Sequence, residues 1–161
     1  MRGDCINITI LVDSREKKNQ HILSYFDKRQ IPYKVKKLDF ADYSFEIDGV
    51  SYGNEYSIER KANLNELSGN FTQQRERFAR EFERSNGKIT LLIEDSSLND
   101  VLTHNYDTQL TEKSYIASLF TFQHRYNLDV NFIDKKFSGL FIYHQFYYYA
   151  KAKGLLVEKV S

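Results

Sequence analysis

The sequence predicts an α/β domain in which a mixed central sheet carries helices on both faces. Short runs of β-branched and aliphatic residues, typical of buried strands, alternate along the chain with longer amphipathic stretches. The chain has 161 residues, which is enough for one hydrophobic core and too few for two ordinary domains. We therefore expect a single domain over residues 1–161.

Composition narrows the location and the partners of the protein. The longest apolar runs have the length of strands, so we expect no membrane span. The N-terminus has no apolar signal segment, and the single cysteine, Cys5, cannot form an intrachain disulfide; both features favour the cytoplasm. With 23 basic and 22 acidic residues, DNA binding would have to come from local basic patches.

The first elements are expected to be two strands with a helix between them. Residues 6–13 are almost continuously β-branched or aliphatic, which predicts a buried strand. Residues 20–29 carry apolar side chains at helical spacing, and Pro32 ends that helix. Residues 33–38 alternate in a way that favours a second strand.

A hairpin follows. Residues 42–47 and 52–61 are expected to be its two strands, because Asp48-Gly49 is a dipeptide that favours a tight turn.

The second half of the chain alternates expected helices and strands. A short helix over 64–68 should end at Gly69, and a highly charged helix over 72–85 should bury Phe78 and Phe82. The remaining expected elements are a strand at 88–94, helices at 97–103 and 111–126, a strand at 129–133 and an aromatic helix at 138–153.

The charged pattern Glu59-Arg60-Lys61 lies on an expected strand. Residues two apart on a strand point to one face, so Glu59 and Lys61 should emerge together and Arg60 on the other face. Asp42, on the preceding strand, can approach Glu59. Two carboxylates can hold Mg²⁺ with water and a phosphate, and an adjacent ammonium completes a minimal set for phosphodiester hydrolysis. The alternative is an ion pair on a solvated sheet edge.

Asp13 ends the first, very apolar strand and is followed by Ser14-Arg15-Glu16. The carboxyl ends of buried strands are where α/β folds usually place their chemistry. Alternatively, Asp13 or Ser14 caps the next helix and Glu16 lies in its first turn. The residues alone leave both interpretations open.

Five segments in a fixed order carry a more specific pattern. Val12-Asp13-Ser14-Arg15-Glu16 is similar to V-D-x-R-E, and Ala41-Asp42 followed by Glu59-Arg60-Lys61 is similar to G-D, a gap and E-R-K. Residues 69–78 are similar in spacing to G-R-(F/Y)-x-E-Q-K-x-R-L, and 91–94 to the core strand after it. In this order they resemble the nuclease domain of the XPF family of structure-specific endonucleases, over most of the chain.

The resemblance implies a restriction-nuclease-like core, Mg²⁺ or Mn²⁺ as the cofactor, and cutting of branched or flapped DNA. Asp42 and Glu59 would be metal ligands with Asp13 beside the metal, and Lys61 would be the catalytic lysine. Arg60 would contact a phosphate or the scaffold. The residues expected to contact DNA are Arg15, Gln74 and Arg75. Without the resemblance, the charged run 73–84 is a solvated helix face with pairs four residues apart.

The chain departs from the family pattern at three positions. Ala41 stands in place of a glycine, which is a mild change if its φ is negative. Asn65 falls on the last aspartate of the signature; it can cap the short helix but brings no charge to a metal. Asn70 replaces an arginine and so removes an expected phosphate contact.

Two further expectations concern assembly and domain content. The segment 138–153 is aromatic on all sides, and large exposed aromatic patches mark interfaces. Because the resemblance implies dimerising nuclease domains, we expect a homodimer through this helix. Family members usually add a C-terminal helix-hairpin-helix region, which we do not expect in this chain; a bacterial or phage-type cytoplasmic enzyme is the expectation.

The function that these observations favour is a metal-dependent endonuclease acting on branched, flapped or single-strand/duplex junction DNA. One alternative is a catalytically inactive DNA-binding or partner subunit with the same fold. Another is a resolvase or restriction-type nuclease, which fold alone does not separate from the first.

Overall fold

Within residues 7–156, which the computed structural model describes, a seven-stranded mixed sheet is flanked by six α-helices and one 3-10 helix. The strands are β1 Ile8–Asp13, β2 Tyr33–Lys36, β3 Tyr43–Ile47, β4 Val50–Ser51, β5 Tyr56–Lys61, β6 Lys88–Glu94 and β7 Asp129–Ile133. The helices are α1 Gln20–Lys28, α2 Leu64–Phe71, α3 Arg75–Arg84, α4 Leu98–Leu102, α5 Glu112–Arg125, η1 Lys135–Phe137 and α6 Ser138–Ala152. The predicted fold class is confirmed.

The sheet has the order β2-β1-β3-β5-β6-β7, and β4 pairs with β3. The strand β3 runs antiparallel to both of its long neighbours, whereas β1–β2, β5–β6 and β6–β7 are parallel pairs. Val12 pairs with Tyr43, and Tyr43 pairs with Ile58. The start of β3 therefore meets the carboxyl ends of β1 and β5, which brings three charged segments of the sequence to one edge.

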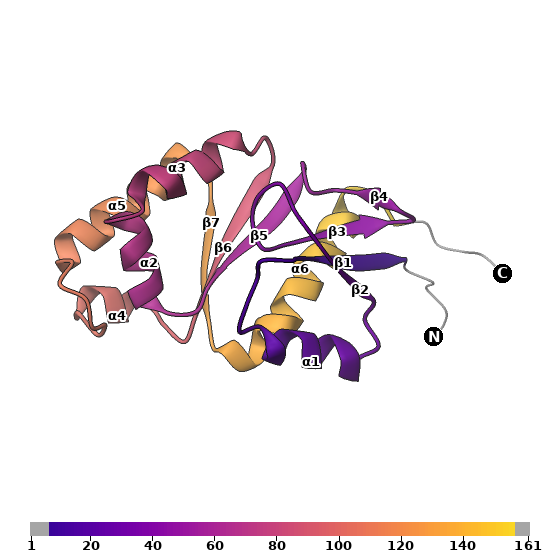
Figure 1. Ribbon diagram of the computed structural model, residues 1–161, viewed down its shortest axis with the longest axis horizontal. Helices are drawn as coiled ribbons and strands as arrows, with labels where there is room; N and C mark the ends of the chain where they lie inside the picture. Colours follow the sequence, from indigo (N-terminus) through magenta and orange to yellow (C-terminus); the bar gives the residue numbers. More distant parts are fainter. Residues whose placement is uncertain (1–6, 157–161) are drawn as a thin grey trace.

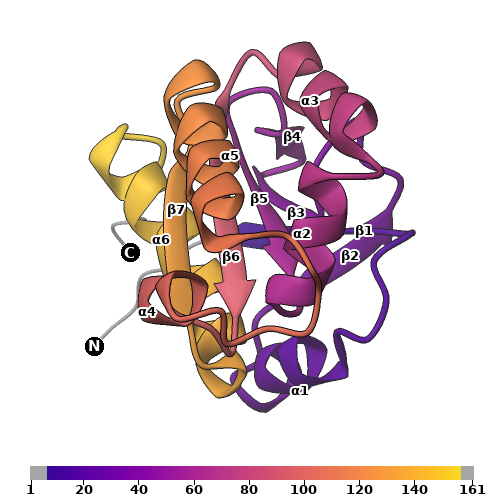
Figure 2. The same cartoon turned by 90° about the vertical axis from the view of Figure 1, so that its left-hand side faces the viewer.

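Helices cover the two faces of the sheet unequally. Figure 1 shows α1 and α6 together on one face and α2, α3 and α5 on the other, and Figure 2 shows the second group from its own side. Alternation along β6 supplies both cores, because Leu92 packs on the α1–α6 side and Leu91 and Ile93 pack on the α2–α5 side. Both cores are rich in aromatic rings, such as Phe45 and Phe146 in the first.

The hairpin differs from the predicted one. Asp48 and Gly49 both have positive φ, at 50° and 82°, which is the geometry of a type I′ turn. That turn, however, joins β3 only to the two-residue β4. After a second turn, in which the N–H of Tyr56 donates to the carbonyl of Tyr52, β5 pairs with the same edge of β3 at Tyr43, while β1 lines the opposite edge. The strand predicted from residue 52 thus begins at Tyr56.

The prediction that Gly69 ends the first helix of this region is wrong. The helix α2 continues through Gly69 to Phe71, because Leu67 and Phe71 on either side of the glycine are buried in the core and hold that turn. The following helix, α3, consequently starts at Arg75 rather than at 72.

Two further expectations concern membrane spans and the N-terminal residues. No helix within residues 7–156 has both the length and the apolar character needed to cross a membrane. Cys5 and the first residue of the strand predicted from Ile6 lie outside the described residues.

Candidate active site

Alternation along β5 separates its charged side chains. Tyr56 and Ile58 point into the core beneath α1 and α6, and Arg60 follows them. Glu59 and Lys61 point to the opposite face, where the ammonium of Lys61 lies 2.9 Å from Oε2 of Glu59. The same ammonium lies 4.9 Å from the centroid of the Phe78 ring of α3. The strand β5 therefore contributes Arg60 to one face of the sheet and Glu59 and Lys61 to the other, as their spacing predicts.

Asp42 is held at this site by both strands beside it. Its N–H donates to the carbonyl of Ile58 at 3.1 Å, and its carbonyl accepts from the N–H of Asp13 at 2.8 Å. Its side-chain Oδ2 accepts from the backbone N–H of Arg60 at 2.8 Å. The carboxylate is thereby fixed against the segment that carries Glu59 and Lys61.

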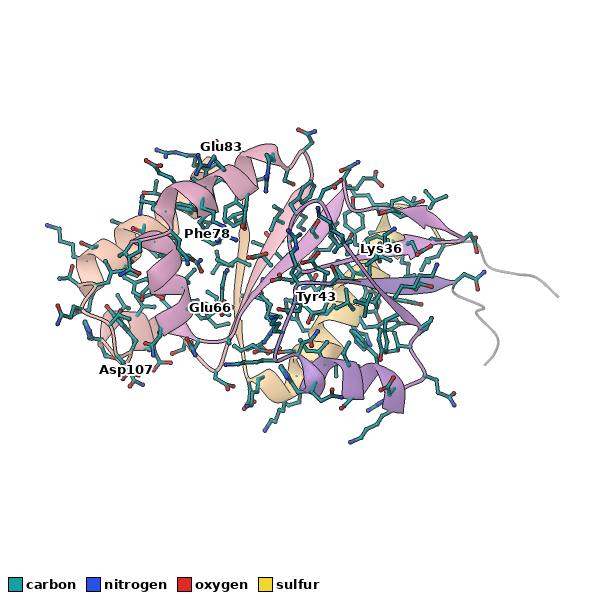
Figure 3. The ribbon with its side chains drawn as sticks, viewed as in Figure 1. Lys36, Tyr43, Glu66, Phe78, Glu83 and Asp107 are labelled. Atoms are coloured by element: carbon teal, nitrogen blue, oxygen red, sulfur yellow. The ribbon has the colours of Figure 1, made fainter. Side chains whose placement is uncertain are left out.

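These side chains border an open hollow of about 460 Å³. The residues of its wall that matter here are Asp42, Glu59, Lys61, Glu66, Lys17 and Lys18. Figure 3 labels two side chains of the helices above this part of the sheet, Glu66 on α2 and Phe78 on α3. The hollow is large enough for a phosphate group with its surrounding water.

Burial and neighbouring charges shift the pKa values of Asp42 and Lys61. Burial raises the pKa of the Asp42 carboxyl well above its usual value, and the nearby charges of Glu59 and Glu16 raise it further. Burial lowers the pKa of Lys61, but the carboxylates of Glu59 and Asp42 outweigh it, so that pKa is raised. The surroundings thus favour the charged form of Lys61 and disfavour the charged form of Asp42.

Arg60 belongs to a buried ion-pair network on the opposite face. Its Nε lies 2.7 Å from a carboxylate oxygen of Glu16, and one terminal nitrogen lies 2.7 Å from Glu94. The other oxygen of Glu94 contacts Nε2 of His21 at 2.7 Å and accepts from the hydroxyl of Ser138. The Arg60 side chain is only 5% exposed. Of the two roles implied for Arg60, the geometry corresponds to the scaffold contact.

Asp13 lies on the same face as Asp42, but its carboxylate is fully engaged. Arg15 donates to both oxygens, from Nε at 2.9 Å and from a terminal nitrogen at 3.1 Å. The N–H of Leu38 donates to Oδ1 at 2.9 Å, and Arg15 also reaches the carbonyl of Leu38 at 2.8 Å. The pair fixes the guanidinium of Arg15, which is otherwise exposed, beside the hollow. It also occupies the oxygens that a metal would need.

The start of α2 differs from the expectation for Asn65. Asn63, not Asn65, caps the helix, since its side chain accepts from the N–H of Glu66 at 2.9 Å. Glu66 in turn accepts from the N–H of Ala62, the residue before the cap, so a second backbone donor at the start of the helix is satisfied. Asn65 points away from the hollow, and its amide exchanges two hydrogen bonds with Asp107, at 2.8 and 3.0 Å.

The expected DNA contacts Gln74 and Arg75 are engaged within the protein. Gln74 accepts from the amide of the buried Asn70 at 2.9 Å. Arg75 donates to the hydroxyl of Ser118 at 2.8 Å, and its guanidinium lies 5.1 Å from the ring centroid of Phe122 on α5. The structure therefore brings Asp42, Glu59, Lys61 and Arg15 together around the hollow. Arg75 instead lies where α3 meets α2 and α5.

Ala41 has a φ of +64°, so the condition for a mild change from glycine is not met. A Cβ in the left-handed region costs about 1–2 kcal/mol relative to ordinary backbone. The strain lies immediately before Asp42, where the chain turns into β3. Strain of this kind persists only where the surrounding structure imposes it.

The donor set defines which metal the residues could hold. Among residues 7–156, no three His, Cys, Asp or Glu side chains form a group that could bind a metal ion. A cation at Asp42 and Glu59 would therefore have two carboxylate ligands and complete its shell with water and substrate. That is how proteins usually hold Mg²⁺, and carboxylate oxygen also suits Mn²⁺.

Glu81 of α3 is a site residue that the sequence analysis missed. It lines a hollow of about 160 Å³ together with Asp42, Glu59 and Arg15. Burial raises the pKa of Glu81, and the charge of Glu59 raises it further. The signal for it was its position three residues after Phe78, on the side of α3 that turns to the sheet.

The family follows from a match that spans most of the chain. The model of the ERCC4 domain matches residues 12–144. The chain belongs to the ERCC4 domain family. This range includes every candidate site residue named above, and the resemblance to the XPF nuclease domain is confirmed.

Solved structures agree with this ERCC4 domain in fold. XPF from Aeropyrum pernix is 19% identical, with a TM-score of 0.68 over 95% of this chain. XPF from Aeropyrum pernix in complex with DNA is 18% identical, with a TM-score of 0.66 over 89% of this chain. The ERCC4 domain spans 66% of the length of each of those chains. No curated protein sequence matches it.

Proposed function

We propose that this ERCC4 domain is a Mg²⁺- or Mn²⁺-dependent DNA endonuclease that hydrolyses phosphodiester bonds in branched, flapped or single-strand/duplex junction DNA. The observation that supports this most is the convergence of Asp42, Glu59 and Lys61 on one face of the sheet, beside an open hollow. The likeness to an XPF in complex with DNA supports DNA as the substrate class.

Each residue has a role that its contacts support. Asp42 and Glu59 would hold the divalent ion, which when bound polarises the phosphoryl group and acidifies a water. The ammonium of Lys61, fixed by Glu59 and Phe78, orients the attacking water or stabilises the negative charge that develops on the phosphate. Asp13 positions Arg15 to bind a phosphate of the DNA. Arg60 stabilises β5 from the opposite face of the sheet through its ion pair with Glu94.

An inactive DNA-binding subunit is the rival function. The departures that favour it, Asn65 and Asn70, hydrogen-bond to Asp107 and Gln74 and do not line the hollow. They leave the set formed by Asp42, Glu59 and Lys61 unchanged. Activity is therefore the better supported function.

Cleavage assays test the proposal. Labelled flap, fork, four-way junction and plain duplex DNA are incubated with the protein in Mg²⁺, in Mn²⁺ or in EDTA. We expect metal-dependent cleavage of the branched substrates. Lys61→Ala and Asp42→Asn should abolish it, whereas Lys113→Ala, at an exposed lysine of α5, should not. If none of the four DNAs is cut in either metal, the enzyme proposal is wrong and the inactive subunit remains.

A homodimer through α6 is part of the same proposal. Phe137, Leu140 and Tyr148 are exposed apolar residues on one side of this segment, and His144 stacks on Tyr148 between them. Sedimentation at micromolar concentration should give a dimer that Tyr148→Glu dissociates. The matched change Phe120→Glu, at an exposed position of α5, should leave the dimer intact. A wild-type protein that sediments only as a monomer contradicts this part.

A further inference from the structure

Three arginines of α3 lie without ion-pair partners beside the site. Arg77, Arg80 and Arg84 are exposed, and none of them takes part in a salt bridge within the described chain. Glutamates lie within one turn on the same helix, so the pairs four residues apart that an ordinary solvated helix would form are not made. The positive charge of this face is therefore available to a ligand.

The arginine face and the carboxylates share one continuous surface. A hollow of about 400 Å³ is lined by Arg15, Arg77, Arg80, Arg84 and two glutamates. The neighbouring hollow of about 160 Å³ shares Arg15, Arg77 and Arg84 with it and reaches Asp42 and Glu59. Arg15 and the two carboxylates also line the hollow that contains Lys61. A furrow thus runs from Lys61, past the carboxylates, along α3.

The spacing of the arginines matches a linear polyanion. Arg77, Arg80 and Arg84 stand three and four residues apart, so their side chains emerge on one side of the helix. The outer two are seven positions apart, which corresponds to about 10 Å along the helix. One strand of DNA carries a phosphate about every 3.4 Å of its axis, so about three phosphates fit this length.

Their neighbour Arg75 is different. Its guanidinium donates to Ser118 and to the carbonyl of Phe71 and lies against Phe122. Figure 3 places Phe78 on the inner side of α3, toward α2, and Glu83 on its outer side. Arg75 therefore connects α3 to the neighbouring helices. Arg77, Arg80 and Arg84 face the furrow or the solvent beside it.

We infer that Arg77, Arg80 and Arg84, together with Arg15, form a binding site for the phosphodiester backbone of the DNA strand that continues from the scissile phosphate. Guanidinium groups bind phosphate oxygens in a bidentate manner, and a near-neutral protein needs such a local patch to hold DNA against its own acidic site. The inference rests on the proposed function and names the path of the substrate across this site.

The test is the salt dependence of DNA binding. Wild-type protein and the triple variant Arg77→Gln/Arg80→Gln/Arg84→Gln are titrated against a fluorescein-labelled flap DNA in EDTA, by anisotropy, over a series of NaCl concentrations. Each lost phosphate contact lowers the slope of log K against log[salt] by about 0.7–0.9. The triple variant should therefore lose about 2 to 3 from that slope.

A matched variant controls for net charge. Arg29→Gln/Lys113→Gln/Arg125→Gln removes three exposed basic residues, one directly after α1 and two on α5, outside the furrow, and should leave the slope unchanged. The variant Arg77→Lys/Arg80→Lys/Arg84→Lys keeps the three charges and should retain most of the slope of log K against log[salt]. Equal slopes for the two glutamine variants overturn the inference.

A measurement on the wild-type protein does not depend on any variant folding. Arginine-specific dicarbonyl modification, mapped by mass spectrometry, should be slowed by flap DNA at Arg77, Arg80 and Arg84 and not at Arg29. Lack of protection at the three arginines overturns the inference. If the protein cuts DNA but the three arginines are insensitive to it, only this inference fails; if it neither binds nor cuts DNA, the proposed function fails as well.

Discussion

The backbone N–H of Arg60 donates a 2.8 Å hydrogen bond to the carboxylate of Asp42. The side chain of the same Arg60 is turned to the other face of the sheet, where it pairs with Glu16 and Glu94. One residue thus anchors the acidic site through its main chain and the sheet beneath α1 through its side chain. Changes at Arg60 and at Asp42 should consequently have different signatures.

Replacing Arg60 should reduce stability strongly. Arg60→Met leaves the carboxylates of Glu16 and Glu94 without their buried counter-charge, a change that costs about 3–5 kcal/mol. Urea unfolding measures it. The control is Lys88→Met, which breaks a half-exposed ion pair with Asp129 and should cost about 1 kcal/mol or less. Similar losses for the two variants would show that Arg60 is not a buried anchor.

Replacing Asp42 should stabilise the metal-free protein at neutral pH. Burial in the folded protein raises the pKa of Asp42 well above that of an ordinary aspartate, so the folded state disfavours the charged carboxylate. The contribution of Asp42 to stability is complete below about pH 4 and is lost as the pH rises through the raised pKa. Asp42→Asn removes that loss, so its Tm in EDTA should exceed that of the wild type at pH 8 and approach it near pH 4.

A divalent metal should reverse the order of the wild-type and Asp42→Asn Tm values at pH 8. On the proposed function, Mn²⁺ would bind the ionised carboxylates of the folded state, so it should raise the Tm of the wild type at pH 8. Asp42→Asn should gain much less, because one of its two carboxylate ligands is gone. A wild-type Tm that Mn²⁺ leaves unchanged would contradict Asp42 and Glu59 as a metal pair.

Ala41→Gly should raise stability. The φ of +64° at this position strains an alanine and suits a glycine, and the gain should be about 0.5–1 kcal/mol after the entropy of the unfolded chain is counted. Ala117→Gly, at an exposed position of α5, is the control and should lose about 1 kcal/mol. Chemical denaturation of both variants checks the opposite signs.

Restoring the aspartate of the family signature should not help this chain. Asn65→Asp would bring a carboxylate to about 3 Å from that of Asp107, where the amide now donates a hydrogen bond. We expect a loss of about 1 kcal/mol and faster hydrogen exchange in residues 105–110. Asn65→Asp/Asp107→Asn should recover both values, since the donor and the acceptor are exchanged.

The sequence predicts those parts of the site that depend on local periodicity. Alternation on a strand has a period of two residues, so the opposite orientations of Lys61 and Arg60 could be read from their spacing. The buried strand β6 and the half-buried edge strand β7 were predicted with their observed bounds, because polar turn residues flank both of them. The caps at Ser97 and Thr111 follow from the same local logic.

What could not be predicted depends on neighbours that are distant in the sequence. The direction of Arg75 is set by Ser118 and Phe122 on another helix, and the end of α2 is set by core packing around Gly69. The positive φ of Ala41 arises where the chain must enter β3 between two other strands. Each of these follows from the assembled sheet and helices rather than from any short pattern.

The alternation along β5 has a consequence for how this domain can vary. On the proposed function, substitutions at Glu59 and Lys61 would affect catalysis, whereas a substitution at the intervening Arg60 would remove the buried ion pairs that stabilise the sheet. A single change at position 59 or 61 would therefore abolish cleavage and leave a folded domain that still binds DNA. Relatives of this domain could thus lose activity and keep their structure through one substitution on a short strand.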